Sequence, residues 1–287
     1  MDYESYLVKY YSKATVKVYK REIEIYLQNN PNAEKALHSD IVNYIGKLRH
    51  RYSNSKTLSR ITACIKVYYN YLTYCGKRKD NPSKSIRLRD KISKDIQLQD
   101  LFTTAELENL LHKKERYSTL EYRNKVLISL LTSQALKPSE ISALTTGDIN
   151  LETATIYIKG SPKTSTRELT LKPNQVLLFY RYQTEIRTKL LKNKESDIFI
   201  IGHRGEPMKE EDISGHVKRI YKGIYGNRKV NCMAIRQSVI TNLLKQGNDL
   251  RIVQVFAGHK NPSTTEKYKQ TDVEVLQMEI NKYHPMK

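Results

Sequence analysis

The sequence predicts a mainly α-helical protein with a small antiparallel β-sheet, in which a small basic helical domain precedes a larger, mostly helical one. Three features predict this architecture. Apolar residues recur at helical spacing along most of the 287 residues. Two short strand-like runs flank a turn near residue 160, as in a β-hairpin. Positive charge is concentrated in the first third of the chain, which sets that part apart in composition.

The first domain is predicted to span residues 1–94 and to be entirely helical. Its three helices are expected over residues 11–29, 40–51 and 56–75. Ser39 and Ser55 are suitable N-caps, because a serine hydroxyl accepts a hydrogen bond from a free N–H of the first helical turn. Gly76 is expected to end the third helix, since glycine readily adopts the left-handed conformation of a C-terminal cap.

Residues 95–101 are predicted to be a linker, and the second domain to span residues 102–287. Thr103 and Glu106 match a capping box, which predicts a helix start. Further helices are expected over residues 126–135, 139–144, 173–191, 211–224, 232–246, 249–257, 263–268 and 273–283. Strands are expected over residues 149–151, 155–159 and 168–171, with a turn at residues 161–164.

The charge balance indicates a polyanionic partner. The chain has 50 Lys and Arg against 30 Asp and Glu, which gives a net charge of +20. Residues 1–94 hold 20 of these bases and 8 of the acids, so +12 lies in the first domain. A surplus of this size favours nucleic acid as the partner ahead of an anionic membrane surface. The alternative is a lysine-rich protein whose charge serves no partner.

Other classes of protein are disfavoured by composition. No run of about 18 apolar residues is present, so no membrane-spanning helix is expected, and the N-terminus shows no secretory signal. The three cysteines, Cys64, Cys75 and Cys232, are odd in number and widely spaced. They fit neither a disulfide framework nor a zinc cluster, and they predict a cytoplasmic protein.

The most specific stretch runs from Ile235 to Tyr268. Arg236 lies early in a predicted helix, Gly258 and His259 form a turn, and Tyr268 lies nine residues after His259. On these residues the chain resembles the tyrosine recombinases, the family of phage integrases and chromosome-dimer resolvases. The resemblance extends to the basic helical first domain, the linker and the hairpin, so it covers nearly the whole chain.

The resemblance implies a site-specific DNA recombinase and integrase. Tyr268 would attack a DNA phosphate to give a 3′-phosphotyrosyl intermediate, and because the free phenol has a pKa of about 10, it needs a cationic environment. Arg236 would clamp the phosphate with its planar fork, and His259 would hydrogen-bond it. The alternative for Tyr268 is surface or core packing, and the alternative for His259 is a structural role. For Arg236 it is a contact with the DNA backbone or an intrahelical ion pair. No metal or other cofactor is implied.

The hairpin is expected to supply a general acid. The family places a lysine there that protonates the leaving 5′-oxygen. Lys163 lies in the turn and is the first candidate, Lys159 is the competing one, and Arg167 aligns with the arginine that opens the returning strand. A lysine in a turn is often only solvated, so the sequence leaves the choice open.

Two positions depart from the family pattern. The family's first catalytic arginine lies in a Thr-Gly-Leu-Arg-x-Ser-Glu-Leu segment, and Lys137 stands at its place here. Lysine keeps the charge but loses the bidentate fork. Met233 stands where the family has a histidine, three residues before Arg236, and it cannot transfer a proton. Glu140 and Asp148 match acidic residues that are mainly structural in the family.

Two functions therefore remain open from the sequence. One is an active recombinase with a relaxed active site, in which Lys137 supplies a point charge. The other is a catalytically impaired homologue that acts as a DNA-binding or accessory partner protein. In either case the family implies two domains that close around double-stranded DNA. It also implies self-assembly, or assembly with a partner recombinase, into a synaptic tetramer in which residues 273–283 dock on a neighbouring subunit.

Overall fold

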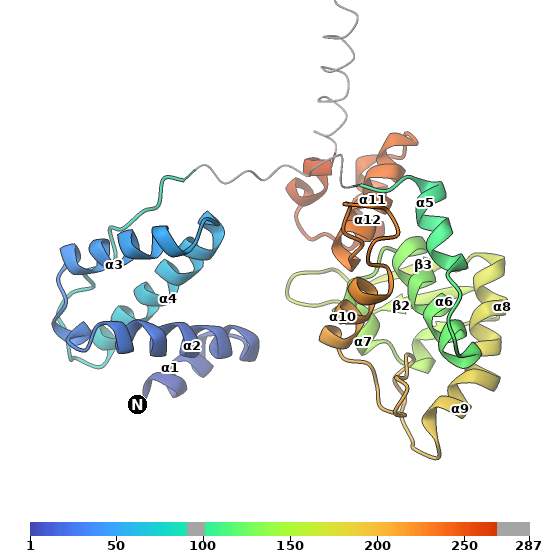
Figure 1. Ribbon diagram of the computed structural model, residues 1–287, viewed down its shortest axis with the longest axis horizontal. Helices are drawn as coiled ribbons and strands as arrows, with labels where there is room; N and C mark the ends of the chain where they lie inside the picture. Colours follow the sequence, from blue (N-terminus) through green and yellow to red (C-terminus); the bar gives the residue numbers. More distant parts are fainter. Residues whose placement is uncertain (91–100, 269–287) are drawn as a thin grey trace, which may run out of the picture. The chain divides into compact units, whose positions relative to one another are not determined.

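The computed structural model describes residues 1–90 and 101–268. The chain divides into two compact units, Met1–Ser93 and Lys94–Lys287, which we describe one at a time (Figure 1). The helix predicted over residues 273–283 and the linker predicted over residues 95–101 fall wholly or mostly outside the described residues.

The first unit is helical throughout. Its helices are α1 (Tyr3–Tyr10), α2 (Lys13–Asn29), α3 (His38–Arg51) and α4 (Ser55–Tyr74), with a 3₁₀ turn at Ala33–Lys35. The sequence did not predict α1. The N-cap predicted at Ser39 is wrong, because α3 begins at His38 and the carboxylate of Asp40 accepts a hydrogen bond from the Leu37 N–H at 2.8 Å. Gly76 has a φ of +71° and ends α4 as expected.

Tyrosines build much of the core of the first unit. Tyr26 and Tyr69 are almost fully buried, and their hydroxyl oxygens lie 2.7 Å apart. Tyr69 also donates to the carbonyl of Ala33 at 2.9 Å, so both buried hydroxyls are satisfied. This network joins α2 and α4 to the turn between α2 and α3.

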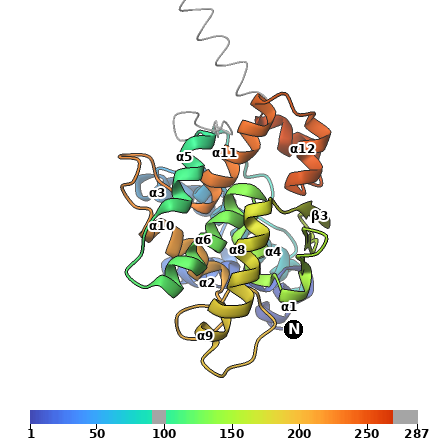
Figure 2. The same ribbon diagram turned by 90° about the vertical axis from the view of Figure 1, so that its right-hand side faces the viewer.

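The second unit is mainly helical. Its helices are α5 (Thr104–Asn109), α6 (Ser118–Ser133), α7 (Pro138–Ala143), α8 (Pro173–Arg181), α9 (Arg187–Leu191), α10 (Glu210–Ile220), α11 (Cys232–Lys245) and α12 (Leu250–Ala257), followed by a helical segment over residues 262–268 (Figures 1 and 2). The predicted capping box of Thr103 and Glu106 is present. The single helix predicted over residues 173–191 is interrupted by a wider π-type turn at Tyr182–Ile186.

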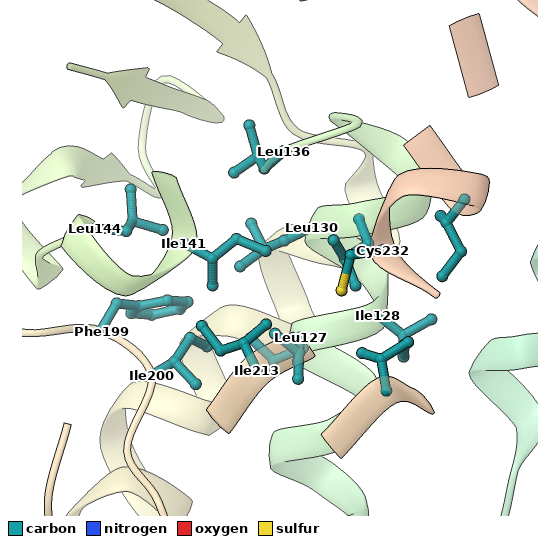
Figure 3. Close-up of a cluster of buried hydrophobic side chains, with 14 of the residues drawn as sticks. Leu127, Ile128, Leu130, Leu136, Ile141, Leu144, Phe199, Ile200, Ile213 and Cys232 are labelled. Carbon is teal, nitrogen blue, oxygen red and sulfur yellow. The ribbon is translucent and has the colours of Figure 1, made fainter. Parts of the chain in front are cut away.

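Helix α6 runs through the core of the second unit. Its residues Leu127 and Leu130 are fully buried. Around them pack Ile141 of α7, Ile213 of α10 and Cys232 of α11 (Figure 3). Because α7 and α11 are both anchored on α6, the segments that flank them are held in place by one continuous apolar core.

The sheet has three antiparallel strands in the order β1 (Ile149–Asn150), β2 (Thr155–Ile158) and β3 (Arg167–Thr170). This confirms the mainly helical fold with one small antiparallel sheet. Ile158 pairs with Arg167 at the end of the hairpin, and residues 161–164 form the predicted turn. Within the described residues, no helix is long and apolar enough to cross a membrane.

Candidate active site

Arg236 lies in the second turn of α11 and is 2% exposed. The Asn231 side chain caps the helix by accepting from the N–H groups of Met233 and Ala234, both at 3.0 Å. The guanidinium donates to the carbonyls of Ala135 and Ala257 and contacts Nε2 of His259 at 3.1 Å. Its donors are therefore directed toward the ends of α6 and α12 and toward His259.

His259 is held by the turn that ends α12. Gly258 has a φ of +66°, and a Cβ there would lie 2.5 Å from Nη1 of Arg167, so only glycine fits. The Gly258 carbonyl accepts from the Ser165 N–H at 3.0 Å, and Gln254 binds the His259 backbone on both sides. The ring is 8% exposed. The turn thus fixes His259 against the hairpin.

Burial and the neighbouring positive charges keep the ring of His259 neutral. Burial, followed by the positive charges of Arg236, Lys137 and Arg167, lowers its pKa to about 4, while Glu140 opposes the shift. At neutral pH the imidazole therefore carries one N–H proton, and the partners of the two ring nitrogens decide which nitrogen holds it.

Tyr268 packs directly on His259. The two rings are stacked, with centroids 6.1 Å apart and an interplanar angle of 13°. Tyr268 is 7% exposed and lies against Ile240 and Val253. Burial raises the pKa of its phenol, and the charge of Arg236 partly offsets that rise. In this arrangement the hydroxyl is protonated at neutral pH.

Lys137 immediately precedes α7 and is half-buried. Two residues earlier, Ala135 has a φ of +51°, a left-handed conformation that positions its carbonyl toward Arg236. Burial and then the charges of Arg236, Arg167 and Lys163 lower the pKa of Lys137. These electrostatic effects place Lys137 within the same positive field as Arg236.

The two hairpin lysines differ in their partners. The Nζ of Lys159 lies 3.2 Å from a carboxylate oxygen of Asp148, so this side chain is already engaged. Lys163 is exposed in the turn and is close enough for its charge to lower the pKa of Lys137. Both lysines and Lys137 line one pocket of about 410 Å³. Within the part of the chain that the structure describes, Lys163 makes no ion pair, so the surroundings favour it over Lys159 as the lysine that reaches a ligand.

A buried ion pair lies beneath the candidate residues, and the sequence did not identify it. Arg167 donates bidentately to the carboxylate of Glu140 at 2.9 and 3.0 Å. The same carboxylate accepts from the Lys137 N–H at 2.9 Å. The side chains of Arg167 and Glu140 are 1% and 6% exposed. This pair links the start of α7 to β3 and to the Gly258 turn.

The predicted site residues fall into two groups. In the first group, Arg236 contacts His259, and the His259 ring stacks on Tyr268. Lys137 and Lys163 line the pocket beside them, which those three residues do not line. Met233, in contrast, is 58% exposed in the first turn of α11, one turn before Arg236. That all five predicted residues face a single phosphate stays a prediction.

Comparisons with known proteins extend over most of the chain. The model of the phage integrase family matches residues 100–274. Tyrosine recombinase XerD of Halalkalibacterium halodurans is 26% identical over 265 residues, covering 90% of this chain and 87% of that protein. Tyrosine recombinase XerC of Lactobacillus delbrueckii subsp. bulgaricus is 25% identical over 284 residues, covering 96% of this chain and 95% of that protein.

Solved structures show the same fold. A lambda integrase dimer bound to a COC′ core site has a TM-score of 0.71 at 14% identity, and the match covers 93% of this chain and 92% of that one. XerH site-specific recombinase bound to a palindromic difH substrate has a TM-score of 0.69 at 18% identity, with 90% and 75% covered.

Proposed function

The chain belongs to the phage integrase family, and from that premise we propose that it is a site-specific DNA recombinase. It would cut and rejoin DNA strands through a 3′-phosphotyrosyl intermediate on Tyr268. The observation that carries this proposal is a chain of two contacts. The ring of Tyr268, the candidate nucleophile, stacks on His259, and His259 is hydrogen-bonded to the buried Arg236. An unbroken cluster of this kind matches a phosphate-transfer site.

The proposed reaction is a transesterification. The Tyr268 phenol gives up its proton to water or a neighbouring residue as its oxygen bonds to phosphorus. The bond from phosphorus to the 5′-oxygen then breaks, and Lys163 gives that oxygen a proton. The phosphorane carries more negative charge than the diester, so Arg236 and Lys137 bind it preferentially and lower the barrier. One phosphodiester replaces another, so the chemistry consumes no nucleotide.

The DNA-free arrangement requires activation. The donors of Arg236 are occupied by the carbonyls of Ala135 and Ala257, and Tyr268 is buried with a raised pKa. A DNA phosphate would have to replace those carbonyls as the acceptor, and the phenol would have to lose its proton near the cations. We therefore propose that the site becomes competent only when DNA binds.

A suicide-substrate assay on cognate DNA ends tests this function. A nick near the scissile phosphate lets the leaving strand diffuse away, so a covalent protein–DNA adduct accumulates. Formation of an adduct that withstands denaturation would support a recombinase. Binding of the same DNA without any adduct, with or without a partner recombinase, would contradict it and favour a DNA-binding accessory protein.

Lys137→Arg is expected to maintain or raise the rate of adduct formation. Arginine restores a planar fork, which can bond two phosphate oxygens where lysine offers a point charge. The gain from one added charged hydrogen bond is roughly 1.5–3 kcal/mol, or about 10-fold and upward in rate. The measurement is single-turnover adduct formation at saturating protein, with Lys137→Gln as the control that should be slower than wild type. A slower Lys137→Arg variant would show that Lys137 does not act on the phosphate.

Double-stranded DNA is the proposed partner, and self-assembly on DNA is proposed with it. The second unit carries an apolar groove of about 360 Å³ between α5, α11 and α12, lined by Leu107, Val239 and Phe256. Ile252 on its rim is 64% exposed. We propose that residues 273–283 of a second copy occupy this groove, because that segment carries apolar residues at helical spacing.

Removing residues 273–287 is expected to abolish cooperative binding to paired sites while binding to a single site survives. The deleted segment supplies the apolar side chains that the groove would bury. Gel-shift titrations on one-site and two-site DNA measure this, and Ile252→Lys, which places a charge on the rim of the groove, should reproduce the defect in the full chain. Unchanged cooperativity in both variants would exclude the docking role.

A further inference from the structure

The partners of His259 define which ring nitrogen carries the proton. Nε2 lies 3.1 Å from Nη2 of Arg236, and an arginine guanidinium can only donate. Nε2 must therefore accept and carry no hydrogen. In the neutral ring the proton then lies on Nδ1, which is 2.9 Å from Oγ1 of Thr265. The Thr265 hydroxyl oxygen is thus the acceptor of the His259 Nδ1–H bond.

We infer that Thr265 is a positioning residue of the active site, which holds His259 as the Nδ1–H tautomer and keeps the Nε2 lone pair directed at the phosphate-binding arginine, Arg236. The inference rests on the proposed function for its effect on catalysis. The tautomer itself is a property of the DNA-free protein. Thr265 is the last residue of a Ser-Thr-Thr run that precedes Tyr268.

Thr265 is placed for this role by the helical segment that carries Tyr268. It precedes Tyr268 by three residues, so both side chains lie on the same face of that segment. Thr265 is fully buried and its hydroxyl lies against the His259 ring on the Nδ1 side. The same ring stacks on Tyr268. One hydrogen bond therefore aligns the His259 ring both with Arg236 and with the candidate nucleophile.

The charges around His259 restrict which protonation state of its ring fits the contact with Arg236. Burial and the positive charges of Arg236, Lys137 and Arg167 lower the pKa of the His259 ring, and the negative charge of Glu140 opposes them. A doubly protonated His259 would direct an Nε2–H at the Arg236 guanidinium, donor against donor. Only a ring with a free lone pair on Nε2 is compatible with the observed contact. In the DNA-free protein His259 therefore accepts a hydrogen bond at Nε2.

The first arm of the test is nitrogen-15 NMR of the histidine rings in the DNA-free full chain at pH 7. The His259 signals are assigned by their loss in His259→Asn. We expect Nδ1 to be of the protonated type, Nε2 to be of the unprotonated type, and the Nδ1 proton to exchange slowly with water. A His259 ring that is cationic, or protonated on Nε2, would overturn the inference whether or not the protein cleaves DNA.

The second arm compares Thr265→Val with Thr265→Ser. Valine keeps the branched shape and removes the hydroxyl, whereas serine keeps the hydroxyl. We expect Thr265→Val to lose the slowly exchanging Nδ1 proton and to slow adduct formation by about 10-fold or more, since a buried donor is left unsatisfied. Thr265→Ser should retain the proton signal and recover most of the rate.

The outcomes distinguish a failure of the positioning role of Thr265 from a failure of the proposed recombinase function. Loss of the signal in Thr265→Val and recovery in Thr265→Ser support the positioning role. An unchanged signal and rate in Thr265→Val, or equal losses in the two variants, would reduce Thr265 to a packing residue and overturn it. If the wild type forms no adduct at all, the proposed function fails, and the NMR arm still decides the tautomer on its own.

Discussion

Tyr268→Phe is expected to abolish the covalent protein–DNA adduct and to leave DNA affinity close to that of the wild type. The phenyl ring can keep the stacking on His259 and the apolar contacts with Ile240 and Val253, so only the hydroxyl is lost. Without an oxygen at this position no bond to phosphorus can form. The measurement is adduct formation on a suicide substrate, with affinity determined in parallel by gel shift.

A matched control separates the loss of the nucleophile from the loss of any tyrosine hydroxyl. Tyr157 lies on β2, lines the pocket that contains Lys137 and Lys163, and is 45% exposed. Tyr157→Phe should form the adduct at nearly the wild-type rate. An adduct that persists in Tyr268→Phe would show that another residue attacks the phosphate. Equal loss in both variants would point to a general defect in DNA binding.

Local sequence signals predicted most elements of the fold. The Thr103–Glu106 capping box marked the start of α5, and Gly76 marked the end of α4. Helix α1 was missed because its buried face includes a single fully buried aliphatic residue, Leu7, among tyrosines. The start of α3 was misplaced because the side chain of Asp40, inside the helix, satisfies the backbone in place of an N-cap hydroxyl.

The candidate site was predictable where its residues are close in sequence. The nine-residue spacing from His259 to Tyr268 predicted that the two residues share one site, and their rings are stacked in the structure. Their catalytic roles stay predictions. The choice between Lys159 and Lys163 stays a prediction. Asp148 reaches Lys159 only once the hairpin has folded, so the sequence did not show that Lys159 has this partner.

The interactions that hold the site together could not be predicted from the sequence, because their partners meet only in the folded chain. Glu140 and Arg167 are far apart in the chain, and the buried pair forms only when α7 packs beside the sheet. Thr265 is close to His259, but its role follows from the donor character of Arg236 on the opposite nitrogen. Spacing identifies residues that touch a substrate more readily than those that orient them.

Glu140→Ala is expected to destabilise the second unit by about 3–5 kcal/mol, because it leaves the guanidinium of Arg167 buried without its counter-charge. Arg167 is 1% exposed on its side chain and gives both of its terminal nitrogens to Glu140. The change also removes the acceptor of the Lys137 N–H at the start of α7. Denaturant unfolding at pH 7, followed on the full chain, measures the loss.

The pH dependence of this loss follows from the pKa of Glu140. Burial acts to raise that pKa, but the hydrogen bonds and charge of Arg167 outweigh it, so the folded-state pKa is lowered from 4.5. A carboxyl group whose pKa is lower in the folded state than in the unfolded state stabilises the fold at pH values above its unfolded-state pKa. This stabilisation is lost as the pH falls through the folded-state pKa. The difference in unfolding free energy between wild type and Glu140→Ala should therefore shrink below pH 4.5.

Lys159→Ala is the matched control, since it removes an ion pair from the same hairpin at the surface. The Lys159 side chain is 59% exposed and its partner Asp148 keeps hydrogen bonds to Thr145. Solvent screens such a pair, so the expected cost is below about 1 kcal/mol. If Glu140→Ala costs no more than Lys159→Ala, the buried pair does not stabilise the fold. The segments carrying Lys137, Arg167 and Gly258 would then have to be held in register by the apolar core around α6 alone.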